Sequence, residues 1–174
     1  MTTVLFPGTF DPIHYGHINI ARRAADLFDE VIVAVYARDH KNSLFSAGER
    51  LAMVEEAFKT VGNISVTSYS GLTVQFAKKI GARAIVRGLR VFSDFEYEFR
   101  MALANNRLEP EIDVIALITT EAHTFLSSTT VREIAALDGD VSSMVPEHVR
   151  LALIEKFSNL GQDQDIVPQT SLRD

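Results

Sequence analysis

Two histidines three residues apart lie in the segment Pro7–His17, near the start of the chain. If a helix begins there, His14 and His17 share one face, and their neutral imidazoles can donate N–H groups to phosphate oxygens at a helix start that already attracts anions. Gly16 leaves room between them for a flat group. Taken alone, such a pair is more often a capped turn. A zinc site is disfavoured because helical ligand pairs prefer the i,i+4 spacing.

Two arginines, Arg87 and Arg90, flank Gly88 and Leu89 directly after an apolar run. A guanidinium presents a rigid fork of donors that suits phosphate oxygens. Two of them at one edge would fit a substrate with phosphate on both sides of a reacting bond. The acidic residue Glu98 follows in a helical pattern. The ordinary alternative for two such arginines is a pair of surface salt bridges.

Three further polar sites also follow apolar runs, and each has an ordinary explanation. Lys41 lies in a polar loop, where a lysine is usually solvated. Thr73 precedes a helical pattern and could simply cap it. The four consecutive hydroxyl residues Ser127–Thr130 usually mean a capped helix start, and Thr130 with Glu133 has the spacing of a capping box. None of these sites identifies a function by itself.

The elements that must position these residues alternate between strand and helix. Five short runs rich in apolar residues have the composition of buried parallel strands: Thr3–Phe6, Val31–Tyr36, Ile64–Ser68, Ala84–Val86 and Val114–Ile118. Helical patterns lie between and after them: His17–Phe28, Ser46–Thr60, Val74–Lys79, Ser93–Asn106, a short helix opened by Thr130, and Pro146–Phe157. We predict capping boxes for Ser46 with Glu49 and for Ser93 with Glu96.

This alternation predicts a single-domain α/β fold, a Rossmann-like, doubly wound sheet of five parallel strands with helices on both faces. The domain is expected to span residues 1–157, and a polar tail at 158–174 is expected to be poorly ordered. In such sheets ligands bind outside the carboxyl ends of the strands. Each polar segment described above follows a predicted strand, so we expect these segments to meet at one edge.

Composition limits the classes of protein that remain. The chain has 174 residues, of which 47% are hydrophobic and 23% charged, and this excludes a disordered protein. It has no cysteine, which excludes disulfides and thiolate catalysis. The net charge of −6 disfavours nucleic acid as a partner. No apolar run reaches the roughly 20 residues that span a bilayer, and the N-terminus lacks a signal-peptide pattern. We therefore expect no membrane association and a cytoplasmic location.

The motifs resemble those of one superfamily of enzymes. The segment Pro7–His17 resembles the signature of the nucleotidylyltransferases, whose (H/T)-x-G-H motif is filled here by His14 and His17. The run Ser127–Arg132 resembles the second phosphate motif of the same superfamily. In that superfamily the second histidine contacts the α-phosphate region of the nucleotide and stabilises the transition state.

A narrower resemblance comes from the run that holds the two arginines. Arg87–Arg90 followed by Asp94–Glu98 resembles the bacterial phosphopantetheine adenylyltransferases, and the resemblance covers the chain from about Thr3 to Phe157. It implies catalytic roles for His17, Lys41 and Arg90. It implies that the acceptor substrate is bound by Thr9, Lys41, Thr73 and Arg87. It implies an ATP site lined by Thr9, Phe10, His17, Gly88, Leu89, Arg90, Glu98, His123, Thr124, Phe125, Leu126, Ser127, Ser128 and Thr129. His123 stands where an aromatic residue such as tryptophan is expected.

The resemblance also implies a reaction, in which ATP and 4′-phosphopantetheine give dephospho-CoA and pyrophosphate. The acceptor's phosphate oxygen is already an anion, so no general base is needed. Mg²⁺ would be held by the ATP phosphates, with no metal ligand from the protein. A homohexamer and feedback inhibition by coenzyme A are further expectations. Two alternatives stay open: a nucleotidylyltransferase acting on nicotinate mononucleotide or transferring a cytidylyl group to a small phosphorylated alcohol, and a non-catalytic nucleotide-binding module.

Overall fold

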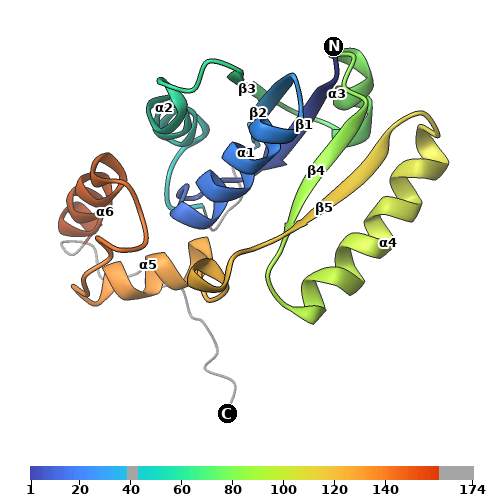
Figure 1. Ribbon diagram of the computed structural model, residues 1–174. Helices are drawn as coiled ribbons and strands as arrows, with labels where there is room; N and C mark the ends of the chain where they lie inside the picture. The colour runs from blue at the N-terminus through green and yellow to red at the C-terminus, as the bar shows by residue number, and fades with distance from the viewer. Residues whose placement is uncertain (39–42, 161–174) are drawn as a thin grey trace.

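Five parallel strands form the centre of the molecule (Figure 1). The computed structural model describes residues 1–38 and 43–160. Within these ranges the strands are β1 (Thr3–Gly8), β2 (Glu30–Tyr36), β3 (Ile64–Tyr69), β4 (Ala84–Leu89) and β5 (Asp113–Ile118). They lie in the order β3-β2-β1-β4-β5, and every neighbouring pair is parallel. The predicted five-stranded, doubly wound sheet is therefore confirmed.

Helices cover both faces of this sheet. They are α1 (Tyr15–Leu27), α2 (Ala47–Phe58), α3 (Thr73–Lys79), α4 (Phe92–Leu108), α5 (Ser128–Ala136) and α6 (Glu147–Leu160), with a 3-10 turn, η1 (Glu121–His123), before α5. Helices α1 and α2 pack on one face, together with α5 and α6, which contact each other. Helices α3 and α4 lie on the other face. Figure 1 shows α4 beside β5, at the edge of the sheet.

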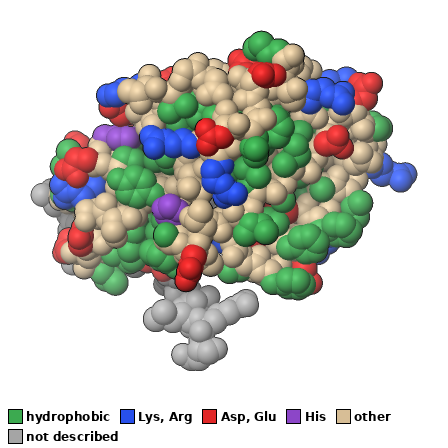
Figure 2. Space-filling view, in the orientation of Figure 1, with side chains coloured by type: hydrophobic (Ala, Val, Ile, Leu, Met, Phe, Trp, Pro, Cys, Tyr) green, Lys and Arg blue, Asp and Glu red, His purple; other side chains and the backbone are tan. Residues whose placement is uncertain are grey.

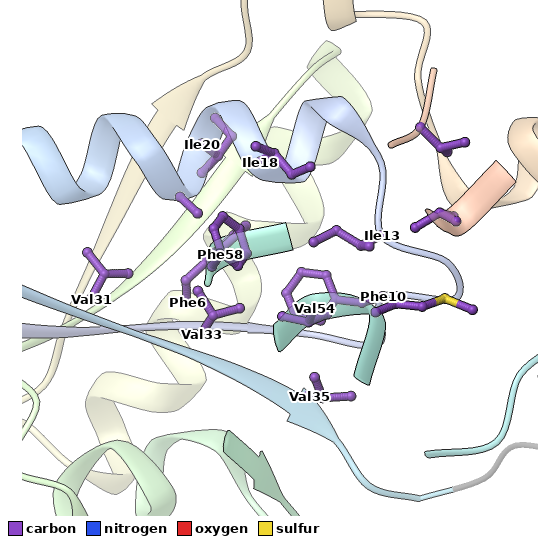
Figure 3. Close-up of a cluster of buried hydrophobic side chains, with 14 of the residues drawn as sticks. Phe6, Phe10, Ile13, Ile18, Ile20, Val31, Val33, Val35, Val54 and Phe58 are labelled. Atoms are coloured by element: carbon purple, nitrogen blue, oxygen red, sulfur yellow. The ribbon is translucent and has the colours of Figure 1, made fainter. Parts of the chain in front are cut away.

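Alternating side chains divide the core between the two faces. In β1, Phe6 points to the larger cluster and Leu5 to the smaller one, as the period-two geometry of a strand requires. Figure 3 shows Phe6 and Val33 of the sheet meeting Ile18 and Ile20 of α1 in the larger cluster. Packing on both faces fixes the positions of the strands, and the site is built on their carboxyl ends.

The two central strands part from each other halfway along. β1 pairs with β2 along its whole length, from Thr3 to Gly8, and β4 pairs with β5 up to Leu89. Between β1 and β4, however, only Val4 with Ala84 and Leu5 with Ile85 are paired. The fork beyond these pairs lies at the reversal of strand order, where open α/β sheets bind their ligands.

The structure confirms one predicted capping box and corrects two other helix starts. Ser46 caps α2, and the side chain of Glu49 accepts the Ser46 N–H at 2.7 Å. The prediction for Ser93 was wrong, because α4 begins at Phe92 without a side-chain cap. The prediction for Thr130 was also wrong, because Ser127 caps α5 and Thr130 donates its N–H to that cap at 3.0 Å.

The last helix begins and ends later than predicted. Pro146 precedes α6 instead of opening it, and its carbonyl accepts the N–H groups of Val149 and Arg150. The helix runs to Leu160, so the first residues of the predicted tail are helical, and residues 161–174 lie outside the described part of the chain. In the described ranges, no helix combines the length and apolar character needed to span a bilayer.

Candidate active site

Two cavities open at the fork between β1 and β4. The first, of about 340 Å³, is lined mainly by strand ends and by residues of α3 and α4, and we name it the α3–α4 cavity. The second, of about 330 Å³, is lined by strand ends and by the first turns of α1, α4 and α5, and we name it the α1–α5 cavity. The residues that line both are Pro7, Gly8, Thr9, Arg87 and Glu98. The two cavities are therefore neighbours that share one wall.

Both histidines of the first motif lie at the start of α1 and line the α1–α5 cavity. His14 is the N-cap, and its Nδ1 accepts the Gly16 N–H at 3.1 Å and the His17 N–H at 3.4 Å. His17 Nδ1 in turn accepts the His14 N–H at 3.3 Å. Since each Nδ1 is an acceptor, a neutral ring carries its proton on Nε2. Each ring thus keeps one N–H donor for another partner.

Both rings are held in the neutral form. Burial, aided by the charge of Arg90, lowers the pKa of His14 from 6.5 to about 3. Burial also lowers the pKa of His17 well below 6.5, with His14, Arg90 and Arg87 acting in the same direction. The two rings are stacked with their centroids 3.7 Å apart, so no acidic side chain lies between them. They are uncharged N–H donors at neutral pH, as the sequence suggested.

The absence of a side chain at Gly16 also makes room for the ring of His14. A Cβ at this position would lie 2.9 Å from the ring carbon Cε1 of His14. A side chain at this position would therefore crowd the His14 ring, and Gly16 itself lines the α1–α5 cavity.

Phe10 supports the histidine motif from inside the protein. Its backbone φ is +51°, a left-handed conformation that is uncommon outside glycine, and its side chain is 2% exposed. The ring meets the edge of His17 at 5.0 Å and that of Phe6 at 5.7 Å. Gly8 makes room for it, because a Cβ there would lie 2.8 Å from the Phe10 ring. The left-handed turn thus places an aromatic ring against His17.

Arg87 stands between the two cavities and is paired with Glu98. The pair is bidentate, with Nε–Oε2 at 2.8 Å and Nη2–Oε1 at 2.5 Å, and the third contact is Nη1 to the carbonyl of Pro7 at 3.2 Å. The side chains remain 30% and 15% exposed, respectively. The salt bridge that was the ordinary alternative is therefore present at Arg87, but both of its partners line the cavities.

Arg90 lines the α1–α5 cavity but not the α3–α4 cavity. Its Nε donates to Asp94 Oδ2 at 3.1 Å, and its Nη1 donates to the carbonyl of Leu126 at 2.8 Å. The second contact ties the end of β4 to the turn before α5. Hydrogen bonding and ion pairing with Arg90 outweigh the effect of burial and lower the pKa of Asp94. The Arg90 guanidinium is thereby held in place beside the two neutral histidines, with Asp94 as its counter-ion.

Hydroxyl groups complete the α1–α5 cavity. Ser127 caps α5, and Ser128 donates its hydroxyl proton to the carbonyl of Pro12 at 2.9 Å. Ser127 and Ser128 place the N-terminal end of α5 at this cavity, and the N-terminal end of a helix favours anions. Thr9 lines both cavities.

The two cavities include part of the predicted nucleotide site. The predicted nucleotide residues that line the α1–α5 cavity are Thr9, Phe10, His17, Gly88, Arg90, Glu98, Ser127 and Ser128. Those that line neither cavity are Leu89, His123, Thr124, Phe125, Leu126 and Thr129. His123 lies close to the first motif, with its Cβ 3.8 Å from where a Gly16 Cβ would be, and its Nδ1 is bonded to Thr120 Oγ1 at 2.8 Å.

The predicted acceptor residues have mixed outcomes. Thr73 lines the α3–α4 cavity as expected of an acceptor residue. The alternative that Thr73 caps α3 is wrong, because Leu72 is at the N-cap and Thr73 Oγ1 is bonded to Tyr69 Oη at 2.9 Å. Lys41 lies outside the residues that the structure describes.

Sequence reasoning missed three aromatic residues of the α3–α4 cavity. Tyr36 and Tyr69 end strands β2 and β3 and lie 5.3 Å apart between ring centroids, and Tyr97 of α4 lines the same cavity. The signal was available for the first two, since Tyr36 ends one predicted strand and Tyr69 directly follows another. Their rings give this cavity an apolar, partly aromatic wall, whereas the α1–α5 cavity is lined by two histidines and two arginine–carboxylate pairs.

The side chains in the described part of the chain offer no cage for a metal ion. Among residues 1–38 and 43–160, no group of three or more His, Cys, Asp or Glu side chains could hold one. A metal at this site would take its ligands from a bound anion and from water, which suits Mg²⁺.

Comparisons with known proteins agree with this geometry. The family model described as "Cytidylyltransferase-like" matches residues 5–134. A solved structure from Vibrio parahaemolyticus, of a protein provisionally named a nicotinate-nucleotide adenylyltransferase, superposes with a TM-score of 0.66 at 19% identity, covering 88% of this chain and 99% of that one. At that identity the likeness shows the fold. The fold and the site thus define a member of the cytidylyltransferase-like nucleotidyltransferases.

Sequence relatives narrow the class. The phosphopantetheine adenylyltransferase of Methylococcus capsulatus is 49% identical over 159 residues, or 91% of this chain and 98% of the relative. That of Thermomicrobium roseum is 47% identical over 162 residues, or 91% of this chain and 97% of the relative. The chain belongs to the phosphopantetheine adenylyltransferase family.

Proposed function

We propose that the protein transfers the adenylyl group of ATP to 4′-phosphopantetheine, giving dephospho-CoA and pyrophosphate. The observation that carries this proposal is the wall shared by the two cavities. One cavity presents the N–H donors of two arginines and two neutral histidines, with each arginine paired to a carboxylate, and the other is partly aromatic. Arg87 belongs to both. This arrangement suits a transfer between a nucleotide and a phosphorylated acceptor with a long, weakly polar arm.

The proposed roles follow from the positions of the side chains. ATP occupies the α1–α5 cavity, where His17 donates its Nε2–H to the α-phosphate and Arg90 with Ser127 holds the β- and γ-phosphates. The acceptor occupies the α3–α4 cavity, with its phosphate on Arg87 and its arm along Thr73. Lys41 is proposed as a second cation on the reacting phosphate, on the ground of the family motif.

The reaction is proposed as an in-line displacement. An oxygen of the acceptor phosphate attacks the α-phosphorus of ATP and forms a new P–O bond, while the bond from that phosphorus to the bridging oxygen breaks and pyrophosphate leaves. The attacking oxygen carries no proton to be removed. Catalysis then depends on placing two anions in contact and on stabilising the charge of the transition state. Neutral donors such as His17 serve this without holding the product by charge.

Mg²⁺ is proposed as the metal of the reaction, bound to ATP phosphate oxygens. When bound, it would neutralise charge on the departing pyrophosphate. The absence of a carboxylate cluster among the described residues is compatible with this mode of binding.

The test is a substrate panel with mass detection of the products. The protein is incubated with Mg²⁺ and either ATP or CTP, together with 4′-phosphopantetheine or nicotinate mononucleotide as acceptor. Formation of dephospho-CoA and pyrophosphate only from ATP and 4′-phosphopantetheine supports the proposal. A dinucleotide or cytidylyl product would assign the protein to another nucleotidylyltransferase activity. Tight ATP binding without any product would make it a binding module.

We also propose that the protein forms a homo-oligomer, a hexamer by the resemblance to its family. Helix α4 has no buried residue, and Phe92, Phe95 and Phe99 are 79%, 48% and 53% exposed. Figure 2 shows hydrophobic side chains gathered on the side where Figure 1 places α4. Exposed apolar patches of this kind usually mark interfaces.

Feedback inhibition by coenzyme A is proposed on chemical grounds. The molecule carries both a pantetheine arm and an adenylyl group, so it can occupy both cavities at once. Inhibition competitive with ATP and with the acceptor would support this, and inhibition by coenzyme A that raises the KM of neither substrate would contradict it.

A cytoplasmic location is proposed because that is where ATP and phosphorylated pantetheine are available.

A further inference from the structure

A buried carboxylate joins three segments that build the site. Asp11 is 4% exposed and directly follows Phe10. Its Oδ2 accepts the N–H of Leu44 and its Oδ1 that of Phe45, both at 2.9 Å. Arg132 Nη1 donates to the same Oδ2 at 3.1 Å and also to the main-chain carbonyl of Asp11. The carboxylate is thus bonded on two sides, from the segment before α2 and from α5.

The neighbouring bonds hold the same three segments. Ser128 Oγ donates to the carbonyl of Pro12 at 2.9 Å, which gives α5 a second attachment to the first motif. Arg50 is fully buried, and its guanidinium donates to the carbonyls of Thr9 and Phe45 at 2.8 and 3.2 Å. The segment next to the histidine motif is therefore fixed to both other segments by charged side chains.

Neither ion-pair partner takes part in the walls of the cavities. Asp11 and Arg132 line neither the α3–α4 nor the α1–α5 cavity, and their side chains are 5% and 18% exposed. Arg132 ends the run that resembles the second phosphate motif. Its guanidinium is nevertheless bonded to Asp11, behind the hydroxyl residues that face the cavity.

We propose that Asp11 and Arg132 are positioning residues, which fix the start of α5 to the histidine motif so that phosphate donors on both segments meet the same nucleotide. This inference rests on the proposed function. It differs from a direct role for Arg132, in which its guanidinium would bind the departing pyrophosphate. A displacement of about 1 Å between such donors can cost on the order of 100-fold in rate.

The test is a double-mutant cycle on the adenylyl transfer, using Asp11→Asn, Arg132→Met and the combined variant. Because both side chains act through one bond, Arg132→Met should lower kcat/KM for ATP by about 10- to 100-fold in the wild-type background. In the Asp11→Asn background the same change should cost at most about twofold. Equal losses in the two backgrounds would overturn the proposal, since Arg132 would then act independently of Asp11.

Two further variants separate positioning from mere folding. Arg132→Lys keeps the positive charge beside Asp11 and should lose less kcat/KM than Arg132→Met, whereas a loss equal to that of Arg132→Met would overturn the proposal. Lys78→Met is the matched control, because it breaks an ion pair with Glu109 that lies away from both cavities. It should leave kcat/KM unchanged. All variants are compared at a temperature where denaturation curves show them fully folded.

The cycle also has a readout that does not depend on turnover. Affinity for MgATP is measured by calorimetry in the same four proteins, and the same non-additive pattern is expected. If the wild-type protein transfers no adenylyl group but binds MgATP with this pattern, the proposed function fails and the positioning role stands. Additive effects on MgATP binding would overturn the positioning role whatever the activity.

Discussion

At the scale of single residues, His17 combines a donor with the absence of charge. Its Nδ1 is occupied by the His14 N–H, and burial keeps the ring neutral. The remaining Nε2–H is fixed in direction before any ligand arrives. Preorganised donors of this kind stabilise a transition state without paying for reorganisation during the reaction.

Replacing His17 with alanine should therefore lower kcat by roughly 100- to 1000-fold, as removal of one preorganised donor usually does. The Kd for ATP should change far less, because the donor acts mainly on the transition state. Steady-state kinetics and calorimetry give the two quantities. His148→Gln, on α6, is the control and should leave kcat unchanged. An unimpaired kcat in His17→Ala would remove the proposed role.

The pKa of His14 predicts how stability depends on pH. The unfolded chain takes up a proton at His14 below about 6.5, whereas the folded protein does so only at about 3. The folded state therefore binds fewer protons in this window, and stability is full above pH 6.5 and is lost as the pH falls toward 3. Urea unfolding at several pH values should show a smaller acid loss in His14→Asn, which keeps a capping side chain. Equal pH dependence in both proteins would refute this assignment.

Arg87 should affect the acceptor more than the nucleotide. Hydrogen bonds to charged groups contribute about 1.5–3 kcal/mol each, so Arg87→Ala should weaken binding of 4′-phosphopantetheine by about 10- to 100-fold and binding of ATP by less. Separate titrations decide between the two. Arg83→Ala removes the same charge next to the opposite end of β4 and should change neither affinity. An equal loss of both affinities would contradict the division of roles.

At the scale of elements, two helix caps of the same chemistry have different surroundings. Ser46 and Ser127 each cap a helix with a side-chain oxygen, but only Ser127 lines a cavity. Both Ser46→Ala and Ser127→Ala should lower the free energy of unfolding by about 1 kcal/mol. Only the second should also raise the KM for ATP. Urea denaturation and kinetics measure both effects, and a raised KM in Ser46→Ala would show that capping alone explains the change.

The elements were predictable to the extent that their signals are local. Strand positions follow from apolar composition, and the Ser46 cap follows from a four-residue pattern. The start of α4 was missed because Val91 and Phe92 open it without a polar cap, and their side chains gave no helix signal. For Thr73 and Ser127, sequence alone does not distinguish a hydroxyl that caps a helix from one that faces a cavity.

At the scale of the whole molecule, the face of α4 should determine the assembly. Phe95 and Phe99 stack at 5.8 Å between centroids while half exposed. Substituting both with glutamate should dissociate the oligomer to a smaller species in sedimentation. Folding of the monomer should change little, because these side chains have few contacts within it. Leu27→Glu, at an exposed site on α1, should preserve the oligomer. A wild-type monomer would refute the proposed assembly.

The bonds that sequence could not predict are the long-range ones. Asp11 and Arg132 are 121 residues apart, and Arg50 reaches Thr9 across 41. No periodicity or motif links such positions, because they meet only once the sheet has formed. The predicted edge of the sheet was found from strand ends. The bracing behind that edge depends on the complete fold.

The fork between β1 and β4 also bears on how the sheet moves. Two residue pairs, Val4 with Ala84 and Leu5 with Ile85, join a three-stranded plate to a two-stranded one. Beyond them, the guanidinium of Arg87 bonded to Pro7 spans the gap. Because only two residue pairs join the strands, the relative position of their carboxyl ends depends on side-chain contacts such as this one and on a bound ligand. A ligand that contacts both parts of the sheet would link them, so the carboxyl ends of β1 and β4 should be more rigid in the ligand-bound protein than in the free protein.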